Sequence, residues 1–122
     1  MPLSPTAALL ALASANFESL VQFYGQLLDQ SPIVLIPSVY AEFQLPGLRL
    51  GIFCPKLPPT PHAAVPTPPV SLCLEVENLE EAIAQFAALG YPPPGEIMTA
   101  SHGREIYAYD PDGNCIILHQ SN

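Results

Sequence analysis

Only a few side chains in this sequence are of types that carry out acid–base, nucleophilic or metal chemistry. Its 122 residues include three cysteines (Cys54, Cys73 and Cys115), three histidines and three basic residues. The cysteines are odd in number and have no C-x-x-C spacing, so the sequence predicts neither a complete disulfide framework nor a structural zinc site. Cysteines that remain thiols are typical of the reducing cytoplasm, where we expect this protein.

Charge and composition exclude several classes of partner. Eleven acidic residues and three basic residues give a net charge of -8. Such a chain repels a phosphate backbone, so the sequence predicts no nucleic-acid partner. The longest apolar run, residues 7–13, is much shorter than the ~18 residues that a membrane span needs, so we expect no membrane association. Hydrophobic residues make up 49% of the chain, which indicates a folded domain.

Prolines divide the chain into two halves of similar length. Seven of the sixteen prolines lie within residues 55–69, a stretch that cannot form regular backbone hydrogen bonds and therefore reads as a semi-rigid connector. The sequence predicts one domain, residues 1–122, that consists of a first module (5–54), this connector and a second module (70–122).

The two modules repeat each other at an offset of 62 residues, at which Leu10, Leu12 and Asn16 align with Leu72, Leu74 and Asn78. After each asparagine, which is a good N-cap, apolar residues follow the period of a helix, so helices are predicted to begin at residues 17 and 79. Strand patterns surround both helices, which predicts the order βαβββ twice. The predicted strands are 8–13, 33–36, 39–45 and 48–53, then 70–76, 96–100, 105–109 and 115–119.

Two strings of the sequence resemble a known family. FYGQLLDQSP at Phe23–Pro32 and YAYDPDGNCIIL at Tyr107–Leu118 are similar to a helix motif and a closing hairpin of the vicinal oxygen chelate superfamily. That superfamily includes glyoxalase I, bleomycin resistance proteins, fosfomycin resistance enzymes and extradiol dioxygenases. The resemblance implies an α+β fold, in which two βαβββ modules form curled mixed sheets around a cleft with the helices on the outer faces. It also implies a homodimer.

The resemblance further implies where a divalent metal would bind in the enzymes of that superfamily. In this sequence those four positions hold Leu9, Gly51, Ser71 and Ile117. Leucine, glycine and isoleucine side chains have no donor atom, and a neutral serine hydroxyl is a poor ligand on its own. We therefore expect no metal and no other cofactor, as in the metal-free bleomycin resistance type.

If residue 71 faces the cleft, as the resemblance implies, every second side chain of the neighbouring strands faces it too. Aromatic rings, thiols and single charged groups suit a small organic molecule with apolar bulk and a few polar groups. Arg49 and Glu75 either pair with each other or contact this ligand. The expected ligand-binding residues are Arg49, Phe53, Cys73, Glu75, Tyr107, Tyr109, Cys115 and His119.

A catalytic hypothesis depends on the pairing of the first and last strands of the second module. If residue 71 lies level with Ile117, then Cys73 lies level with His119. An imidazole within reach of a thiol could activate it as a thiolate nucleophile.

The sequence therefore supports competing functions. The loss of all four metal ligands favours a metal-free protein that binds or sequesters a small organic molecule in the cleft between the modules. The alternative is a glyoxalase-like lyase or related enzyme with a displaced or absent metal site. A third hypothesis is a protein-interaction scaffold in which the proline-rich connector docks a partner.

Overall fold

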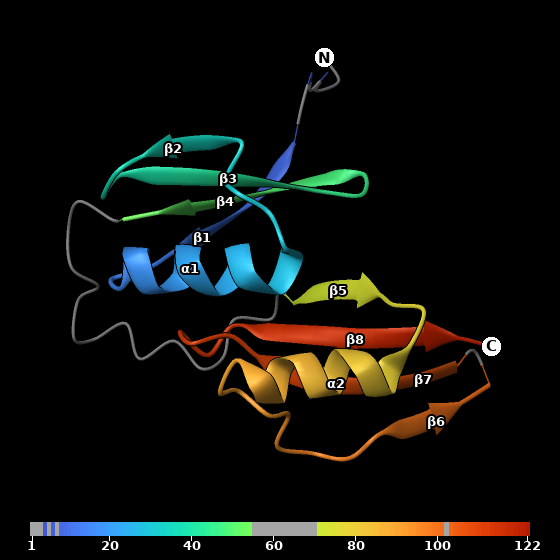
Figure 1. The fold of residues 1–122 in the computed structure, drawn as a ribbon. Coiled ribbons are helices and arrows are strands. Elements are labelled where there is room, and N and C mark those ends of the chain that lie inside the picture. Colours follow the sequence, from blue (N-terminus) through green and yellow to red (C-terminus); the bar gives the residue numbers. More distant parts are fainter. Residues whose placement is uncertain (1–3, 5, 7, 55–70, 102) are drawn as a thin grey trace, which may run out of the picture. The chain divides into compact units, whose positions relative to one another are not determined.

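Each repeated half of the sequence forms a four-stranded sheet with one helix against it (Figure 1). The computed structural model describes residues 4, 6, 8–54, 71–101 and 103–122. The chain divides into two compact units, Met1–Pro59 and Thr60–Asn122. The predicted connector, residues 55–69, lies outside the described residues.

The first unit contains strand β1 (Leu9–Ala13), helix α1 (Phe17–Leu28) and strands β2 (Val34–Ile36), β3 (Tyr40–Leu45) and β4 (Leu48–Phe53). Its sheet, called sheet A here, has the order β1-β4-β3-β2. Strand β1 pairs with β4 in parallel, because α1 returns the chain across the sheet. The other two pairs are antiparallel.

The second unit repeats this topology with strand β5 (Leu72–Glu75), helix α2 (Leu79–Ala88) and strands β6 (Met98–Ala100), β7 (Gly103–Tyr109) and β8 (Cys115–Ser121). Its sheet, called sheet B here, has the order β5-β8-β7-β6, with β5 parallel to β8. The predicted α+β class and the βαβββ repeat are therefore confirmed. Among the described residues, no helix is long and apolar enough to cross a membrane.

One face of each sheet packs against the helix of the same unit. On that face most of the alternating strand residues are apolar and buried, and the side chains named below are at most 4% exposed, while Leu10, Leu12 and Leu74 are half-buried. The opposite side of each sheet is called its helix-free face below. The buried residues are Leu20, Phe23, Tyr24, Phe43, Leu50 and Ile52 in the first unit, and Leu79, Phe86, Ile106, Ala108, Ile116 and Leu118 in the second.

The two helices begin at the predicted residues but with different caps. Asn78 has an extended backbone (φ -136°, ψ 106°), and its side-chain oxygen accepts a hydrogen bond of 2.9 Å from the Glu81 N–H. The prediction of an asparagine N-cap is confirmed there. Asn16, with ψ 58°, makes no side-chain cap bond, and its own N–H donates to Ser14 Oγ at 3.0 Å. At α1 the prediction is wrong, because this backbone does not have the extended conformation that a capping residue usually adopts.

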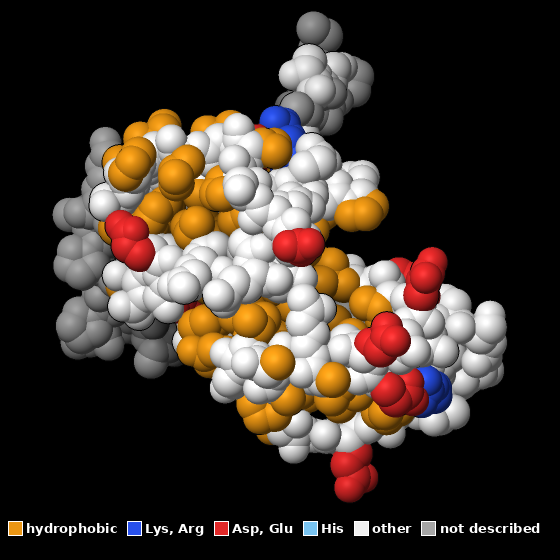
Figure 2. Space-filling model, in the orientation of Figure 1, with side chains coloured by type: hydrophobic (Ala, Val, Ile, Leu, Met, Phe, Trp, Pro, Cys, Tyr) orange, Lys and Arg blue, Asp and Glu red, His pale blue; other side chains and the backbone are white. Residues whose placement is uncertain are grey.

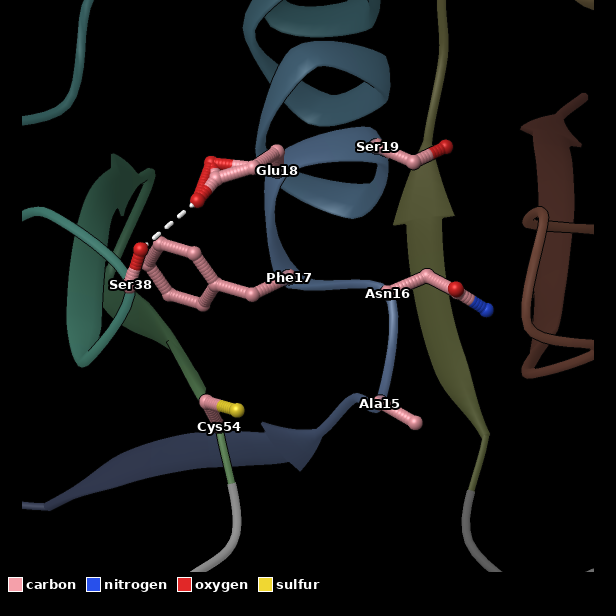
Figure 3. Close-up of a pocket in the computed structure, with 7 residues that line it drawn as sticks. All are labelled: Ala15, Asn16, Phe17, Glu18, Ser19, Ser38 and Cys54. Atoms are coloured by element: carbon pink, nitrogen blue, oxygen red, sulfur yellow. Dashed lines mark hydrogen bonds between the residues drawn. The ribbon is translucent and has the colours of Figure 1, made fainter.

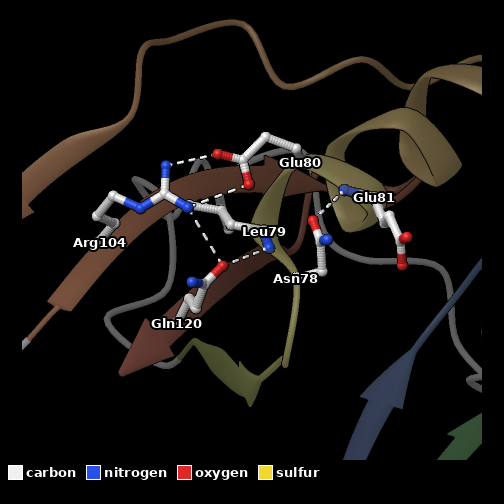
Figure 4. Close-up of polar contacts among 6 residues, drawn as sticks. All are labelled: Asn78, Leu79, Glu80, Glu81, Arg104 and Gln120. Carbon is white, nitrogen blue, oxygen red and sulfur yellow. Dashed lines mark hydrogen bonds and ion pairs between the residues drawn. The ribbon is translucent and has the colours of Figure 1, made fainter. Parts of the chain in front are cut away.

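Polar contacts also hold the start of α2 against β7 and β8 (Figure 4). The Gln120 side-chain oxygen accepts bonds from the Leu79 N–H at 2.7 Å and from Arg104 Nη2 at 3.2 Å. Arg104 forms two further bonds with Glu80, of 2.6 and 3.0 Å, and this guanidinium lowers the pKa of Glu80. Arg104 is therefore engaged in joining the helix to the sheet.

Strand β7 begins at Gly103, earlier than predicted, because glycine permits a very close approach to β8. Gly103 has φ +144°, and a Cβ atom there would meet the Gln120 carbonyl oxygen at 2.2 Å. The close approach of the two backbones lets β7 and β8 pair along their whole length, beginning with Gly103 opposite Ser121. Strand β8 accordingly continues to Ser121, beyond the predicted end at residue 119.

Candidate functional site

The helix-free face of sheet B carries six of the eight predicted ligand-binding residues. Strand register places them in adjacent rows, and the residues between them in sequence are the buried ones that face α2. The predicted assignment of side chains to faces is therefore correct for this sheet, while ligand contact by these residues stays a prediction. The rows are Cys73, Ile117 and Tyr107; Glu75, His119 and Glu105; and Cys115 with Tyr109.

A cluster of short hydrogen bonds lies at one end of this face. His119 Nδ1 lies 2.7 Å from Glu75 Oε2, while Glu75 Oε1 accepts bonds from the Ser121 hydroxyl at 2.6 Å and from the Ser121 N–H at 2.8 Å. These bonds, that of the Ser121 hydroxyl first and that of His119 second, lower the pKa of Glu75. The Glu75 side chain is 56% exposed and that of His119 is 15% exposed. The carboxylate therefore stays ionised near neutral pH and orients the imidazole.

The predicted Cys73–His119 pair is wrong. In the observed register Cys73 lies level with Ile117, and the residue level with His119 is Glu75. Partial desolvation by the neighbouring side chains raises the pKa of the Cys73 thiol although the residue is exposed, and the nearby charges of Glu75 and Glu105 raise it further. This environment opposes formation of a thiolate, so the structure gives no support to a Cys73 nucleophile.

Glu105 is a member of this face that sequence analysis missed. It lies level with His119 across β7 and β8 and is half-buried. Its sequence parity with Tyr107 and Tyr109 is the signal that would have placed it on the helix-free face. With Glu105 included, the face carries two carboxylates beside one imidazole.

The helix-free face of sheet A carries the two remaining predicted residues, Arg49 and Phe53, together with a buried carboxylate. Glu42 is only 7% exposed. The Tyr40 hydroxyl donates a bond of 2.7 Å to Glu42 Oε1, and Arg49 Nη1 lies 3.5 Å from Glu42 Oε2. Burial and the neighbouring Glu42 carboxylate raise the pKa of Tyr40.

Arg49 and Glu75, which were expected either to pair with each other or to contact the ligand, each have a partner within their own sheet. Arg49 pairs with Glu42 inside its own sheet, and Glu75 pairs with His119 and Ser121 inside the other. Glu42 was not predicted because, in the first module, the expected ligand-binding residues came from the last strand alone, whereas Glu42 lies on β3, opposite Gly51.

Two cavities lie at helix N-termini. One of about 400 Å³ lies at the start of α1 (Figure 3), where Ser38 Oγ donates a bond of 2.9 Å to Glu18 beside Phe17 and Cys54. The other, of about 610 Å³, lies at the start of α2 and is lined by residues that include Glu77 and Glu81. Acidic side chains already complement the positive end of each helix, so neither cavity suits an anionic ligand.

No protein-family model and no curated protein matches this sequence. Solved structures match it along almost its entire length. The fosfomycin resistance protein FosX from Listeria monocytogenes is 17% identical, with a TM-score of 0.76 over 98% of this chain and 96% of its own. A glyoxalase / bleomycin resistance protein from Catenulispora acidiphila is 22% identical, with a TM-score of 0.68 over 94% of this chain and 97% of its own.

The chain shares its fold with these two solved proteins. A protein from Agrobacterium tumefaciens, solved by NMR in solution, is similar too, at 26% identity and a TM-score of 0.74 over 92% of this chain and 93% of its own. The resemblance seen in the FYGQLLDQSP and YAYDPDGNCIIL strings is thus confirmed at the level of the fold.

The residues at the metal positions of this superfamily fold do not fit a divalent metal. Leu9, Gly51 and Ile117 have no donor atoms on their side chains, which leaves only the hydroxyl of Ser71. The space beside Gly51 is filled, because a Cβ atom there would lie 2.7 Å from Tyr40 Oη and 2.8 Å from Leu9 Cδ1. Within the described ranges, no three histidine, cysteine or acidic side chains are grouped in a way that could hold a metal ion.

The lowered pKa of Glu75 predicts how stability depends on pH. Its pKa in the folded state lies below the ordinary value of 4.5, so its bonds to Ser121 and His119 stabilise the folded protein above that pH and lose this effect as the pH falls through the folded pKa. We expect the Glu75→Gln variant to melt below the wild type near neutral pH, and the difference to shrink as the pH falls from about 5.5 to 3. Melting temperatures measured by circular dichroism across this range would show it.

The matched control for this experiment is Glu96→Gln. Glu96 is exposed and lies outside both helices, and no hydrogen bond of its side chain is present within the described part of the chain. A difference between wild type and Glu75→Gln that stays constant down to pH ~3 would contradict the role assigned to these bonds.

Proposed function

We propose that this chain binds a small organic molecule on the helix-free faces of its sheets and does so without a divalent metal. The observation that carries the proposal is the arrangement at Gly51, where Tyr40 and Leu9 fill the space that a metal-ligating side chain would need. Solved proteins with this fold include a fosfomycin resistance protein and a glyoxalase / bleomycin resistance protein. A role in binding or detoxifying a small molecule agrees with both.

The helix-free face of sheet B supports this proposal by its mixture of side chains. Tyr107, 44% exposed, provides a flat apolar surface, and Cys73 and Ile117 lie beside it in the same row. The next row offers the polar groups of Glu75 and His119. Apolar surface with a few fixed polar groups is what binding of a small organic molecule requires.

The cytoplasm is the compartment that we propose. In the structure Cys54, Cys73 and Cys115 are thiols, and the first two are exposed. Exposed thiols persist in a reducing compartment.

A homodimer is proposed as well, and the support for it is an apolar patch on β2 and its flanks, where Ile33, Val34, Leu35, Ile36 and Val39 are 39–53% exposed (Figure 2).

The first prediction from this proposal concerns metal content. Protein purified without chelators should contain far less than one equivalent of zinc, nickel, manganese or iron, because three of its four metal positions lack donor atoms and the fourth offers only a neutral hydroxyl. Elemental analysis after gel filtration measures this directly. One retained equivalent of metal, together with lyase activity on the methylglyoxal–glutathione adduct, would instead support the glyoxalase-like alternative.

The second prediction concerns Tyr107. A compound from a library of neutral aromatic molecules that raises the melting temperature of the wild type should bind Tyr107→Ala about tenfold more weakly, because one aromatic contact is lost. The unliganded variant should melt close to the wild type, since this ring is 44% exposed and lies outside the core under α2. Tyr91→Ala is the matched control, because Tyr91 is 37% exposed but follows α2 and lies outside the face. Equal effects of the two variants would argue against a site on sheet B.

The third prediction concerns the dimer. Sedimentation at micromolar concentration should give a species of roughly twice 13.1 kDa. Leu35→Glu should shift it toward monomer, because a glutamate on the β2 patch would face another copy of an already acidic chain. Met98→Glu is the control, since Met98 is 43% exposed on the edge strand of the other sheet. A wild type that remains monomeric would refute the dimer.

A further inference from the structure

Glu42 and its two partners hold one arginine on the helix-free face of sheet A. A carboxylate as buried as Glu42 needs partners to offset its loss of hydration. Tyr40 supplies one hydrogen bond at 2.7 Å, and Arg49 supplies the positive charge at 3.5 Å. Tyr40 reaches Glu42 across Gly51, whose missing side chain makes room for the tyrosine hydroxyl. The result is a guanidinium anchored at one nitrogen.

Most N–H donors of the Arg49 guanidinium have no acceptor among the described residues. A guanidinium has five N–H donors in a planar fork. Within the described residues, the only hydrogen bond of the Arg49 side chain is the one from Nη1 to Glu42, and its length of 3.5 Å is at the outer limit for such a bond. The side chain is 36% exposed. Arg49 is thus positioned by one weak bond and retains donors for a second acceptor.

A cavity provides the place for that acceptor. Arg49 lines a cavity of about 210 Å³ at the β3–β4 turn, together with Ala8, Gln44, Gly47 and Leu48. The Gln44 amide nitrogen is already bonded to the carbonyl oxygens of Leu45 and Leu48. The guanidinium is therefore the one charged group among these lining residues, and Gln44 is the one other polar side chain.

We propose that this cavity binds the carboxylate group of a small organic monoanion, with the Arg49 guanidinium as its bidentate donor. Planar donors of a guanidinium match the two oxygens of a carboxylate. A monoanion is favoured over a dianion such as phosphate, because Glu42 already balances the charge of Arg49 and each further negative charge adds repulsion. The inference deepens the proposed function and rests on it, since it names the chemical class of the ligand.

The test uses propionate as the probe, propionamide as its uncharged counterpart and inorganic phosphate as the dianion, each titrated into the ¹⁵N-labelled full chain. Propionate should produce saturable shifts of the Gly47, Leu48 and Arg49 backbone amides and of the Arg49 Nε–H signal, with a Kd on the order of millimolar. Propionamide and phosphate should produce much smaller shifts of the same signals. Equal shifts with propionamide, or stronger binding of phosphate, would overturn the proposal.

Variants assign the effect to Arg49. Arg49→Gln should weaken propionate binding roughly tenfold or more, because charge-assisted bonds are lost. Arg104→Gln should leave it unchanged, since Arg104 is bonded to Glu80 and Gln120. Arg49→Lys keeps a positive charge beside Glu42, so it preserves the fold if Arg49→Gln does not, and the loss of the planar fork should still weaken binding several-fold. Unchanged affinity in Arg49→Lys, or an equal loss in Arg104→Gln, would refute the assignment.

Failure of this inference is distinguishable from failure of the proposed function. Suppose that propionate does not shift the signals of Gly47, Leu48 and Arg49, while neutral aromatic compounds still bind and lose affinity in Tyr107→Ala. Arg49 then does not bind an anionic group of the ligand, and the proposed function stands. If neither class of compound binds, both are refuted.

Discussion

Alternation of side chains along paired strands decides which groups of this chain are available for chemistry. Leu50, Ile52, Ile116 and Leu118 are at most 1% exposed, and burying each such side chain contributes ~1.5–3 kcal/mol to stability. A shift of one residue in either sheet would turn the buried side chains of the shifted strand of that sheet to the opposite face. The hydrophobic core under each helix therefore holds Arg49 on the helix-free face of sheet A and His119 on the helix-free face of sheet B. Both proposed ligand contacts depend on this separation of polar from buried apolar side chains.

The sequence was sufficient to predict features that depend on local periodicity. The repeat, both helix starts and the division of strand residues between faces follow from spacing within single elements, as at Leu72, Cys73 and Leu74. The pairing of β5 with β8 could not be predicted in this way, because strand offset depends on contacts between distant segments. The observed pairing of β5 with β8 differs from the predicted pairing by two residues. A shift of two residues leaves every side chain on the same face of the sheet, so Cys73 lies on the helix-free face as predicted, but the residue level with it is Ile117 and not His119.

The partners of the charged groups show the same limit, because the sequence left open whether Arg49 and Glu75 pair with each other or contact a ligand. Glu42 lies on a middle strand and becomes a partner of Arg49 only through the β3–β4 register. Gly51 is informative for a related reason. Its missing side chain removes a metal donor and at the same time admits Tyr40, which completes the hydrogen bonding of Glu42. The missing side chain of Gly51 thus connects the absence of a metal donor at that position to the arrangement that holds Arg49.

A small organic molecule should bind on the helix-free faces of the sheets. Intermolecular nuclear Overhauser effects between protons of the ligand and of the protein test this most directly. Ile116 and Ile117 are adjacent residues of one strand that face opposite sides of sheet B, as do Tyr107 and Ala108. A bound aromatic compound should show effects to the side-chain protons of Tyr107 and Ile117, and none to those of Ile116 and Ala108. Effects to Ile116 and Ala108, or effects confined to residues around the start of α2, would contradict the account.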